Sequence, residues 1–333
     1  MVLRALRGER HAQIPRVLSP GPVLVTGAGG FIGRAVVDQL LDQGYAVRRA
    51  VRRAGDLDPR CDTTVVGSID ARTAWDDALD GVGTVVHLAA HVHAARDPLA
   101  MFRAVNVDGT LRFARAAIAA RVRRFVFASS LAVHAATGAR ALTPEDPPAP
   151  STPYGESKAE AERALEELTH TCPLELVIVR PPMVYGPGNP GNMQRLLALV
   201  ARRVPLPLGA VRNRRSMIYV TNLASAFVAI VAAPHARGIY LVRDEEDLAT
   251  PDLVRRLAHA LGVKPPLLAP LPPALVSALA RLAGRGRDAQ AVLESLHVDD
   301  SAFRRDFGWR APIALDAGLA ATADWYRLAR IRT

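Results

Sequence analysis

The sequence predicts an α/β protein: a doubly wound parallel sheet with a smaller C-terminal lobe that binds substrate. Two patterns carry this prediction. From residue 22 to residue 180, short runs rich in Val, Ile and Leu alternate with stretches of helical character, as in parallel sheets whose two faces are covered by helices. After residue 180 the alternation gives way to segments rich in Pro and Gly, such as "PPMVYGPGNPGN" and "KPPLLAPLPP", which predict turns and an irregular second lobe.

The individual elements follow from these patterns in order. The apolar runs predict strands, because Val, Ile, Phe and Thr suit a pleated and buried surface. The stretches between them predict helices, because their apolar residues recur every three or four positions. The expected strands span residues 22–27, 46–51, 63–67, 84–90, 124–130 and 174–180. The expected helices span residues 31–43, 73–80, 98–120 and 155–169, with two more at 193–203 and 222–233.

The chain is expected to have three parts. Residues 1–20 mix arginines with prolines and are expected to form an N-terminal extension. Residues 21–185 are expected to form the sheet domain, which residues 215–245 complete. Residues 186–214 and 246–330 are expected to form the substrate-binding lobe.

Charge and composition exclude several classes of protein. The 333 residues carry a formal charge of +10, but the arginines are scattered without an aromatic-rich basic stretch, so we expect no nucleic-acid partner. No apolar run is long enough to span a membrane, and residues 1–20 lack the apolar core of a secretory signal. Cys61 and Cys172 are far apart and outside metal-ligand spacing, which excludes a disulfide scaffold and a zinc site. The expected location is the cytoplasm.

A glycine-rich segment, "VLVTGAGGFIG", lies between the first expected strand and the first expected helix. Gly27, Gly30 and Gly33 would let the backbone turn tightly and approach a pyrophosphate, which binds at the positive end of a helix. The spacing differs from GxGxxG, and a structural glycine turn is the alternative. In its strand–loop–helix setting the segment predicts a Rossmann-type dinucleotide site, with Phe31 and Ile32 also beside the cofactor.

The end of the second strand indicates which dinucleotide is bound. In NAD-binding proteins an acidic residue about 20 positions after the glycines holds the ribose 2′-hydroxyl, but this chain has Val51 there, followed by Arg52 and Arg53. Guanidinium groups suit a 2′-phosphate. NADP(H) is therefore favoured and NAD(H) is the alternative, since Arg52 also fits the general richness of this chain in arginine.

The segment "PYGESK" contains Tyr154 and, four residues later, Lys158, so their side chains share one face of a helix. An ammonium group near a phenol stabilises the phenolate and lowers its pKa from about 10. Of the 42 Lys and Arg residues only Lys158 and Lys264 are lysine, which indicates that position 158 requires a compact ammonium group. A surface Tyr–Lys pair on an amphipathic helix is the alternative.

Ser129 and Ser130 end the strand 124–130, at the sheet edge where doubly wound folds bind ligands. A hydroxyl there can bond a substrate oxygen and align it with Tyr154, although a plain turn serine is also possible. Asn106, in "VNVDGT", is expected near a helix start. It would either orient Lys158 or cap the helix.

Several motifs occur in a fixed order from about residue 22 to the C-terminus: "TGAGGFIG", "HLAA", "NVDGT", "ASSLAVH", "PYGESK", "RPPMVYGPGN", "RSMIYVTNLASA" and "FGWRAPIALDAGLAATADWY". In this combination the sequence resembles the extended short-chain dehydrogenase/reductase family, in its NAD(P)-dependent sugar-nucleotide epimerase/dehydratase branch. The stretches "HLAAHVHAARDPL" and "RPPMVYGPGNPGNMQRLLALVARRVPLPLGAVRNRRSMIYV" are similar to UDP-glucose 4-epimerase-like and 4-keto-sugar reductase enzymes of bacterial O-antigen and capsule synthesis.

The resemblance implies roles for particular residues. Ser130, Tyr154 and Lys158 would be the catalytic residues. The substrate would contact His93, Ser130, Tyr154, Asn192 and Arg215, the last two at its diphosphate. The cofactor would contact Gly27, Gly30, Phe31, Ile32, Gly33, Arg52, Ser68, Ile69, Leu88, Ala89, Ala90, Asn106, Lys158 and Pro181. The family also implies a homodimer in which helices 98–120 and 155–169 pair.

Some residues depart from the family pattern or invite another interpretation. Where many sugar epimerases have "VYG" after the catalytic serine, this chain has Val133-His134-Ala135, and it has Met183 where many have Asn. These departures leave the sugar open. His87, His91 and His93 have no carboxylate at ligand spacing, so no metal site is expected.

The sequence therefore predicts an NAD(P)-dependent oxidoreductase acting at C4 of a nucleoside-diphosphate sugar. The favoured reaction is 4-keto-sugar reduction, in which Tyr154 supplies the proton and Ser130 holds the oxygen. The alternative is an NAD-dependent UDP-sugar 4-epimerase, which oxidises C4 and returns the hydride to the other face. Further alternatives are a reductase of a non-sugar ketone, as in the flavonol and steroid branches, and a catalytically silent dinucleotide-binding protein.

Overall fold

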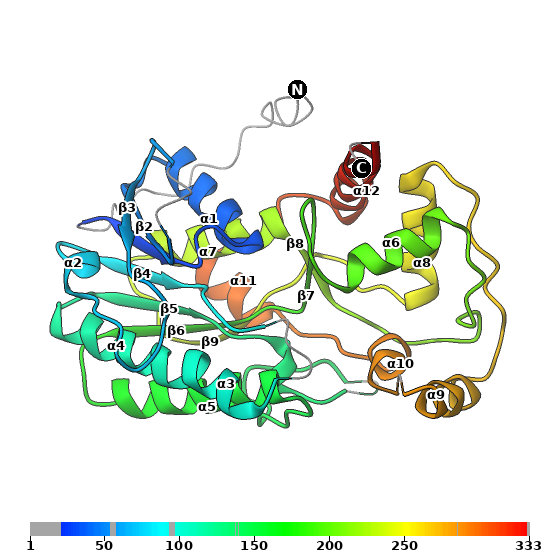
Figure 1. Cartoon of the computed structure of the whole chain (residues 1–333), viewed down its shortest axis with the longest axis horizontal. Helices are drawn as coiled ribbons and strands as arrows, with labels where there is room; N and C mark the ends of the chain where they lie inside the picture. The colour runs from blue at the N-terminus through cyan, green and yellow to red at the C-terminus, as the bar shows by residue number, and fades with distance from the viewer. Residues whose placement is uncertain are drawn as a thin grey trace.

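The computed structural model describes residues 21–53, 58–92, 97–136, 138, 140–284 and 286–331, so the expected extension 1–20 lies outside the described residues. A seven-stranded parallel sheet in the order β3-β2-β1-β4-β5-β6-β9 forms its centre (Figure 1). This confirms the predicted doubly wound α/β fold. The strands are β1 (Val23–Thr26), β2 (Val47–Val51), β3 (Asp62–Val65), β4 (Thr84–His87), β5 (Arg124–Ala128), β6 (Glu175–Arg180) and β9 (Gly238–Leu241).

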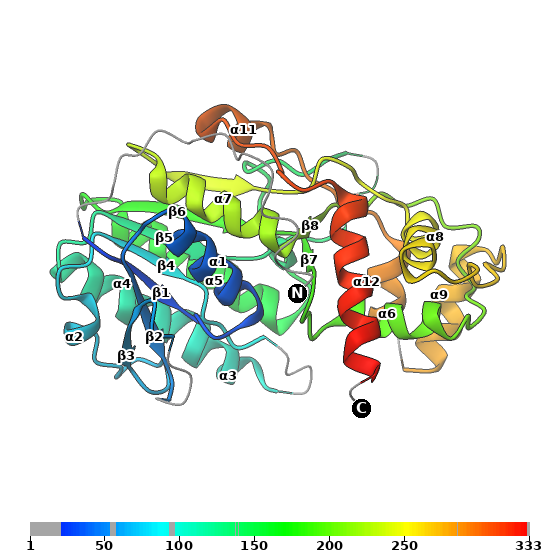
Figure 2. The same ribbon diagram turned by 90° about the horizontal axis from the view of Figure 1, so that it is seen from above.

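Helices cover both faces of the sheet, as Figures 1 and 2 show. The first face carries α1 (Phe31–Asp42), α7 (Val220–Ala232) and α11 (Ser301–Phe307). The second face carries α2 (Asp76–Leu79), α4 (Thr110–Ala119) and α5 (Pro153–Thr169). Because both faces are covered, the central strands β1, β4, β5 and β6 are buried along nearly their whole length rather than at alternate positions.

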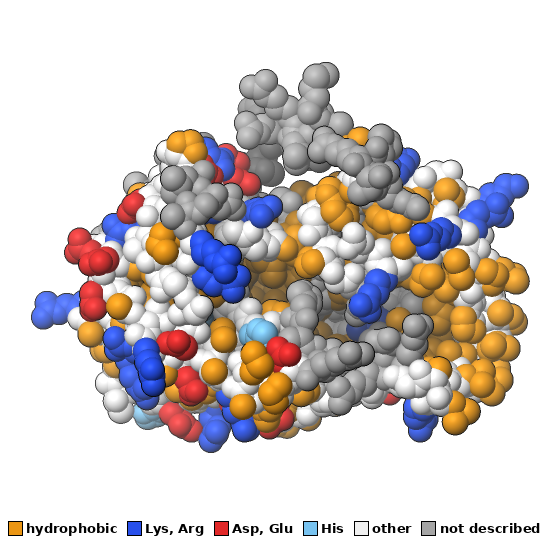
Figure 3. All heavy atoms as spheres, in the orientation of Figure 1, with side chains coloured by type: hydrophobic (Ala, Val, Ile, Leu, Met, Phe, Trp, Pro, Cys, Tyr) orange, Lys and Arg blue, Asp and Glu red, His pale blue; other side chains and the backbone are white. Residues whose placement is uncertain are grey.

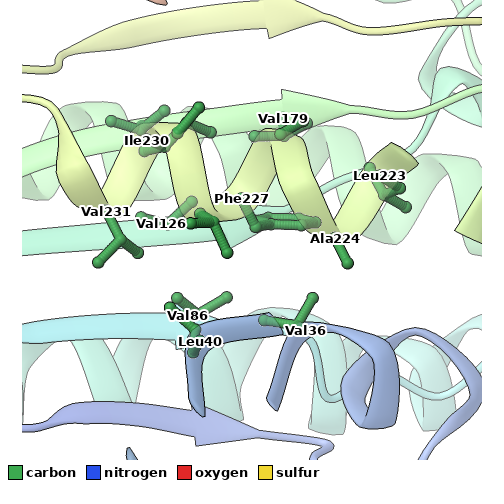
Figure 4. Packing of buried hydrophobic residues seen from close by; sticks show 14 of the residues in the cluster. Val36, Leu40, Val86, Val126, Val179, Leu223, Ala224, Phe227, Ile230 and Val231 are labelled. Atoms are coloured by element: carbon green, nitrogen blue, oxygen red, sulfur yellow. The ribbon is translucent and has the colours of Figure 1, made fainter. Parts of the chain in front are cut away.

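The core of the first face lies between α1, α7 and the sheet. Figure 4 shows Val36 and Leu40 of α1 close to Val86 of β4, with Phe227 of α7 packed near Val126 of β5. Phe227 is only 1% exposed. Helix α7 is apolar on nearly every side because the sheet, α1 and the C-terminal segment all pack against it.

The C-terminal lobe stands beside the carboxyl ends of the strands (Figure 2). It contains a two-stranded parallel sheet of β7 (Met183–Tyr185) and β8 (Met217–Tyr219). Its own apolar core is formed largely by helices α6, α8 and α12. The helices of the lobe are α6 (Asn192–Ala201), α8 (Thr250–Leu261), α9 (Pro273–Leu282), α10 (Gly286–Leu293) and α12 (Leu315–Ile331).

One buried carboxylate ties the lobe to the sheet domain. Asp244, just after β9, accepts hydrogen bonds from the Tyr185 hydroxyl at 2.8 Å and the Asn222 amide at 2.7 Å. Asn222 in turn exchanges two hydrogen bonds with the backbone of Ile313. Burial raises the pKa of Asp244, while these hydrogen bonds act in the opposite direction. The carboxylate thus links β9, β7, α7 and the segment before α12.

Two helices of the first half of the chain and one region of the second half differ from the prediction. The expected helix 98–120 is divided into α3 (Leu99–Arg103), a π-helical segment (Ala104–Gly109) and α4. The expected helix 73–80 is regular only over α2. Helices α8 to α12 lie where the sequence analysis expects no helix, because proline-rich segments interrupt the pattern before them. Within the described residues, no helix has the length and apolarity needed to cross a membrane.

Replacing the central aromatic of the first face tests this packing. Phe227→Ala should lower the free energy of unfolding by about 3–5 kcal/mol, because it leaves a cavity between α7 and the sheet. Leu328→Ala, at a position 52% exposed on α12, should change it by less than about 0.5 kcal/mol. Urea denaturation of both variants measures the difference, and equal effects would contradict the described core.

Candidate functional site

The glycine-rich loop packs tightly against the end of β4. Gly27 has φ +66, and a Cβ there would lie 2.8 Å from the backbone nitrogen of Ala89. A Cβ at Gly33 would lie 2.1 Å from the carbonyl oxygen of Gly27. The Thr26 hydroxyl accepts from the backbone N–H groups of Leu88 and Ala89, each at 3.2 Å. The loop is therefore held close to the sheet edge, and larger residues at these two glycines would displace it.

Helix α1 begins directly after this loop, and no side chain caps its N-terminus. Its N-cap is Gly30, and the first turn begins with Phe31, Ile32 and Gly33. Uncapped N–H groups at a helix start, together with the helix dipole, attract anions. The cradle formed by Gly27, Gly33 and this helix start fits the pyrophosphate of a dinucleotide, which supplies a hydride-accepting nicotinamide when bound.

The other residues expected near the cofactor lie at the same edge of the sheet. Arg52 directly follows β2 and is exposed. Ser68 and Ile69 follow β3, and Ile69 contacts the π-helical segment near Gly109. The remaining ones follow the carboxyl ends of β4 and β6: Leu88, Ala89, Ala90 and Pro181.

Tyr154 and Lys158 lie in the first two turns of α5, one turn apart. Thr152 caps this helix through a hydrogen bond from the Gly155 N–H at 3.0 Å. Burial raises the pKa of Tyr154 to about 12, and a hydrogen bond with the Ser130 side chain opposes that shift. The structure thus brings Ser130 and Tyr154 together, but the expected lowering of the Tyr154 pKa by Lys158 is wrong here, because desolvation dominates.

Lys158 is almost completely buried, with 2% of its surface exposed. Its ammonium lies 4.2 Å from the centroid of the Phe127 ring, a cation–π distance. Burial lowers the pKa of Lys158 to about 7, and the nearby charge of Glu162 limits the shift. The side chain is therefore held on the protein-facing side of α5 and changes charge readily near neutral pH.

Ser129 and Ser130 differ in their hydrogen bonding. Ser130 begins a short 3₁₀ turn and its hydroxyl accepts from the Ala132 N–H at 3.1 Å. Ser129 is buried, and its hydroxyl has no hydrogen-bond partner within the described residues. A Cβ at Gly155 would lie 2.1 Å from the Ala132 carbonyl oxygen, so the Ser130 turn and α5 are in direct backbone contact. This contact fixes Ser130 relative to Tyr154.

Asn106 does not stand at a helix start, contrary to the prediction. It lies within the π-helical segment, buried, with its side chain directed to two other segments. Its amide donates to the His91 carbonyl and to the Ser157 hydroxyl, each at 3.0 Å, and its oxygen accepts from the His91 N–H at 2.8 Å. The wider π-helical turn allows these bonds. Asn106 therefore acts on α5 through Ser157, the neighbour of Lys158.

Arg180, Glu162 and His134 form a buried hydrogen-bond network beside Lys158 and the Ser130 turn, and the sequence did not predict it. Arg180 at the end of β6 donates to both carboxylate oxygens of Glu162, with a shortest distance of 2.6 Å, and both side chains are 2% exposed. Its other nitrogen donates to His134 Nε2 at 3.1 Å. Since arginine can only donate, His134 must accept there and carry its proton on Nδ1. Burial and Arg180 lower the pKa of His134.

This network joins three pieces of the site. Glu162 lies one helical turn after Lys158, and His134 follows the Ser130 turn directly. The helix with Tyr154, the turn with Ser130 and the end of β6 are therefore held in one arrangement by charge-assisted hydrogen bonds. In the sequence, Arg180 opens the "RPPM" motif and His134 replaces a residue of the family pattern. Only the fold shows that the two side chains meet.

Of the residues His93, Asn192 and Arg215, which are expected to contact the substrate, the structure describes the side chain of Arg215 only. His93 and the Asn192 side chain lie outside the described residues. Arg215 is half-buried and donates to the Glu294 carbonyl oxygen at 3.0 Å. Its backbone pairs with Leu248 and Leu296, so it lies in the lobe at the start of β8. Burial lowers the pKa of Arg215.

Two of the histidines considered as metal ligands, His87 and His91, have structural partners. His87 is buried between the Thr26 hydroxyl at 2.7 Å and the Thr110 hydroxyl at 3.0 Å, and burial lowers its pKa to about 3. His91 pairs with Asp97 at 2.8 Å, a carboxylate partner that the spacing argument missed. No cluster of three potential metal ligands occurs among the described residues.

The fold and this edge define a dinucleotide-dependent oxidoreductase of the Rossmann type. The family model described as NAD dependent epimerase/dehydratase family matches residues 23–242. The chain therefore belongs to the NAD-dependent epimerase/dehydratase family, as the sequence motifs indicate. It is an enzyme of the sugar-nucleotide epimerase/dehydratase type.

Individual relatives and solved structures are similar to this chain along nearly its whole length. A UDP-glucose 4-epimerase of Vibrio cholerae is 36% identical, over 94% of this chain and 98% of the relative. A ceramide reductase of Caulobacter vibrioides is 31% identical, over 93% of this chain and 95% of the relative. The crystal structure of MoeE5 with UDP-glucuronic acid and NAD superposes with a TM-score of 0.73 at 26% identity, covering 93% of this chain and all of MoeE5 (100%).

The burial of Lys158 predicts a pH dependence of stability. Because the folded-state pKa is about 7 and the unfolded value is about 10.4, the unfolded chain binds more protons between these values. The free energy of unfolding should therefore rise with pH in this window, by up to about 1.4 kcal/mol per pH unit from this group.

Denaturation of the wild-type protein and Lys158→Met at pH 7.5 and pH 9.5 measures this contribution. The variant should lack that part of the slope. Lys264→Met, at an exposed position, should retain it. Equal slopes for the wild type and Lys158→Met would contradict the described burial.

Proposed function

We propose that the protein is an NAD-dependent 4-epimerase of a nucleoside-diphosphate sugar. The observation that carries this proposal is the hydrogen bond between Ser130 and Tyr154, one helical turn before the buried Lys158, at the sheet edge that also holds the glycine-rich loop. The likeness to a UDP-glucose 4-epimerase along nearly the whole chain supports it. It replaces 4-keto-sugar reduction as the leading function, because that likeness favours an internal redox cycle.

In the proposed mechanism Tyr154 would accept the proton of the C4 hydroxyl, and a nicotinamide dinucleotide held at the glycine-rich loop would supply the acceptor for the C4 hydride. The Ser130 hydroxyl holds the same oxygen as it becomes a carbonyl. Reversal of these steps on the other face of the 4-keto sugar inverts C4. Burial raises the pKa of the Tyr154 phenol further above neutral pH, and in the proposed complex with substrate and cofactor the ammonium form of Lys158 would favour the phenolate.

The network of Glu162, Arg180 and His134 would keep the reacting groups aligned during this cycle. The negative charge of Glu162 raises the pKa of Lys158 and so favours its ammonium form. The ion pair with Arg180 would hold the Glu162 carboxylate in place. This arrangement suits Lys158, which is buried and yet must carry a charge when Tyr154 is a phenolate.

Arg215 is our candidate for the diphosphate of the substrate. It stands in the lobe at the start of β8, and only one hydrogen bond, to a carbonyl oxygen, engages its guanidinium among the described residues. A half-buried guanidinium with free donors suits bidentate binding of phosphate oxygens. We also propose a homodimer formed through residues 98–120 (α3, the π-helical segment and α4) and 155–169 (α5), as the family resemblance implies.

Reduction of a carbonyl substrate with NADPH is the second candidate. The exposed Arg52 at the end of β2 favours it, since this position faces the ribose 2′-position in Rossmann folds. The ceramide reductase relative shows that a full-length homologue of this chain is named as a reductase.

The central test is Tyr154→Phe, which removes only the hydroxyl. Turnover of UDP-glucose or UDP-galactose should fall by about 10²–10⁴-fold, because proton transfer is lost. Dinucleotide binding, followed by fluorescence, should remain close to wild type. Turnover within a few-fold of wild type would remove Tyr154 from the mechanism.

The cofactor that the purified protein retains separates the two candidates. Denaturation followed by chromatography should release NAD, because an epimerase regenerates its cofactor within each cycle. Release of no dinucleotide, with NADPH bound more tightly than NADH, would favour the reductase. In that case Arg52→Ala should weaken NADPH binding by about tenfold or more, because a charge-assisted hydrogen bond is lost, and should leave NADH binding unchanged.

A further inference from the structure

The most exposed apolar surface in the described part of the chain lies on and before α9. Leu267 is 69% exposed and Leu282 is 87% exposed, with Leu275 at 47% and Leu279 at 52%. These four residues are called the α9 surface below. Figure 3 shows hydrophobic side chains gathered over the end of the molecule where Figure 1 places α8 and α9.

The α9 surface is organised by a helix. Leu275, Leu279 and Leu282 are spaced four and three residues apart, so they share one face of α9. The helix packs against α10, and none of its residues is buried. An amphipathic helix with leucines on one face normally buries them against its own domain. Here the protein leaves them to the solvent, which marks an interaction surface.

The charge around the α9 surface indicates its partner. The lobe segments 186–214 and 262–287 contain nine Arg and Lys residues and no Asp or Glu. Arg281 lies on α9 itself, and Lys264 lies three residues before Leu267. In the described part of the chain, Arg202, Arg203 and Lys264 form no ion pair. Exposed leucines with basic residues such as Lys264 and Arg281 beside them are typical of helices that lie in the interface of an anionic membrane.

Other occupants fit less well. A second copy of this chain would bring an equally cationic lobe to the contact, and like charges oppose such pairing. A nucleic acid would use the cations but not the leucines, because its phosphates and bases offer few partners for aliphatic side chains. An anionic bilayer uses both, since its acyl boundary accepts the leucines while its headgroups neutralise the cations.

We propose that the α9 surface docks on an anionic phospholipid membrane, so that the protein binds the membrane peripherally through its lobe. The leucines would enter the interface, and Lys264, Arg281 and the basic residues of the lobe would contact lipid phosphates. The sheet domain, with its glycine-rich loop, would remain in water. This proposal does not rest on the proposed reaction, because docking requires no turnover.

Vesicle sedimentation tests the proposal with the full chain. The wild-type protein should bind vesicles of phosphatidylcholine and phosphatidylglycerol, bind pure phosphatidylcholine far less, and lose affinity as salt is raised. The double variant Leu279→Glu/Leu282→Glu should reduce the partition coefficient at least tenfold. Leu328→Glu is the matched control, because Leu328 is also 52% exposed but lies on α12, and it should bind as the wild type does.

A second variant keeps the test decisive if the double variant folds poorly. Lys264→Gln/Arg281→Gln keeps the leucines and should weaken binding by about fivefold for each cation removed. Thermal unfolding and dinucleotide binding report whether each variant is folded. Absence of wild-type binding to anionic vesicles would overturn the proposal, as would equal binding by the leucine variant. A leucine variant that turns a dimer into a monomer, with no vesicle binding by the wild type, would assign the surface to self-association instead.

Discussion

The buried ion pair between Glu162 and Arg180 is the interaction on which the site depends. Neither side chain reaches solvent, and the two bond through both carboxylate oxygens. Such a pair tolerates no loss of a partner, because the remaining charge would be buried alone. By linking α5 to β6, it places Tyr154 and Lys158 relative to the sheet. Through His134 it also holds the turn that carries Ser130.

A parallel sheet explains why residues so distant in sequence meet. The glycine-rich loop follows β1, the Ser129–Ser130 pair follows β5, and Arg180 ends β6. Every one of these strands points the same way, so their carboxyl ends form one edge. Helices on both faces make the strands rigid and apolar, while the edge stays free for polar side chains. The site therefore lies at the carboxyl ends of the strands, where helices do not cover the sheet.

The two parts of the molecule divide the work between them. The sheet domain carries the proposed dinucleotide cradle and the proposed reacting groups, and Asp244 anchors the lobe to it through Tyr185 and Asn222. The lobe carries Arg215 just before β8 and the exposed leucines of the α9 surface. In our proposals the charge of the lobe serves two places: the diphosphate of the substrate, at Arg215, and lipid phosphates at the α9 surface.

The sequence alone determined the fold class and the family. Apolar runs alternating with helices encode a parallel sheet, and "TGAGGFIG" and "PYGESK" are local signals whose residues act within one loop or one helix turn. Only the tertiary structure decided the environment of these residues. Burial set the pKa of Tyr154 and of Lys158, the π-helical turn redirected Asn106, and packing of distant segments joined His134, Arg180 and Glu162. Desolvation and long-range contacts depend on which segments meet in space, and no local pattern records that.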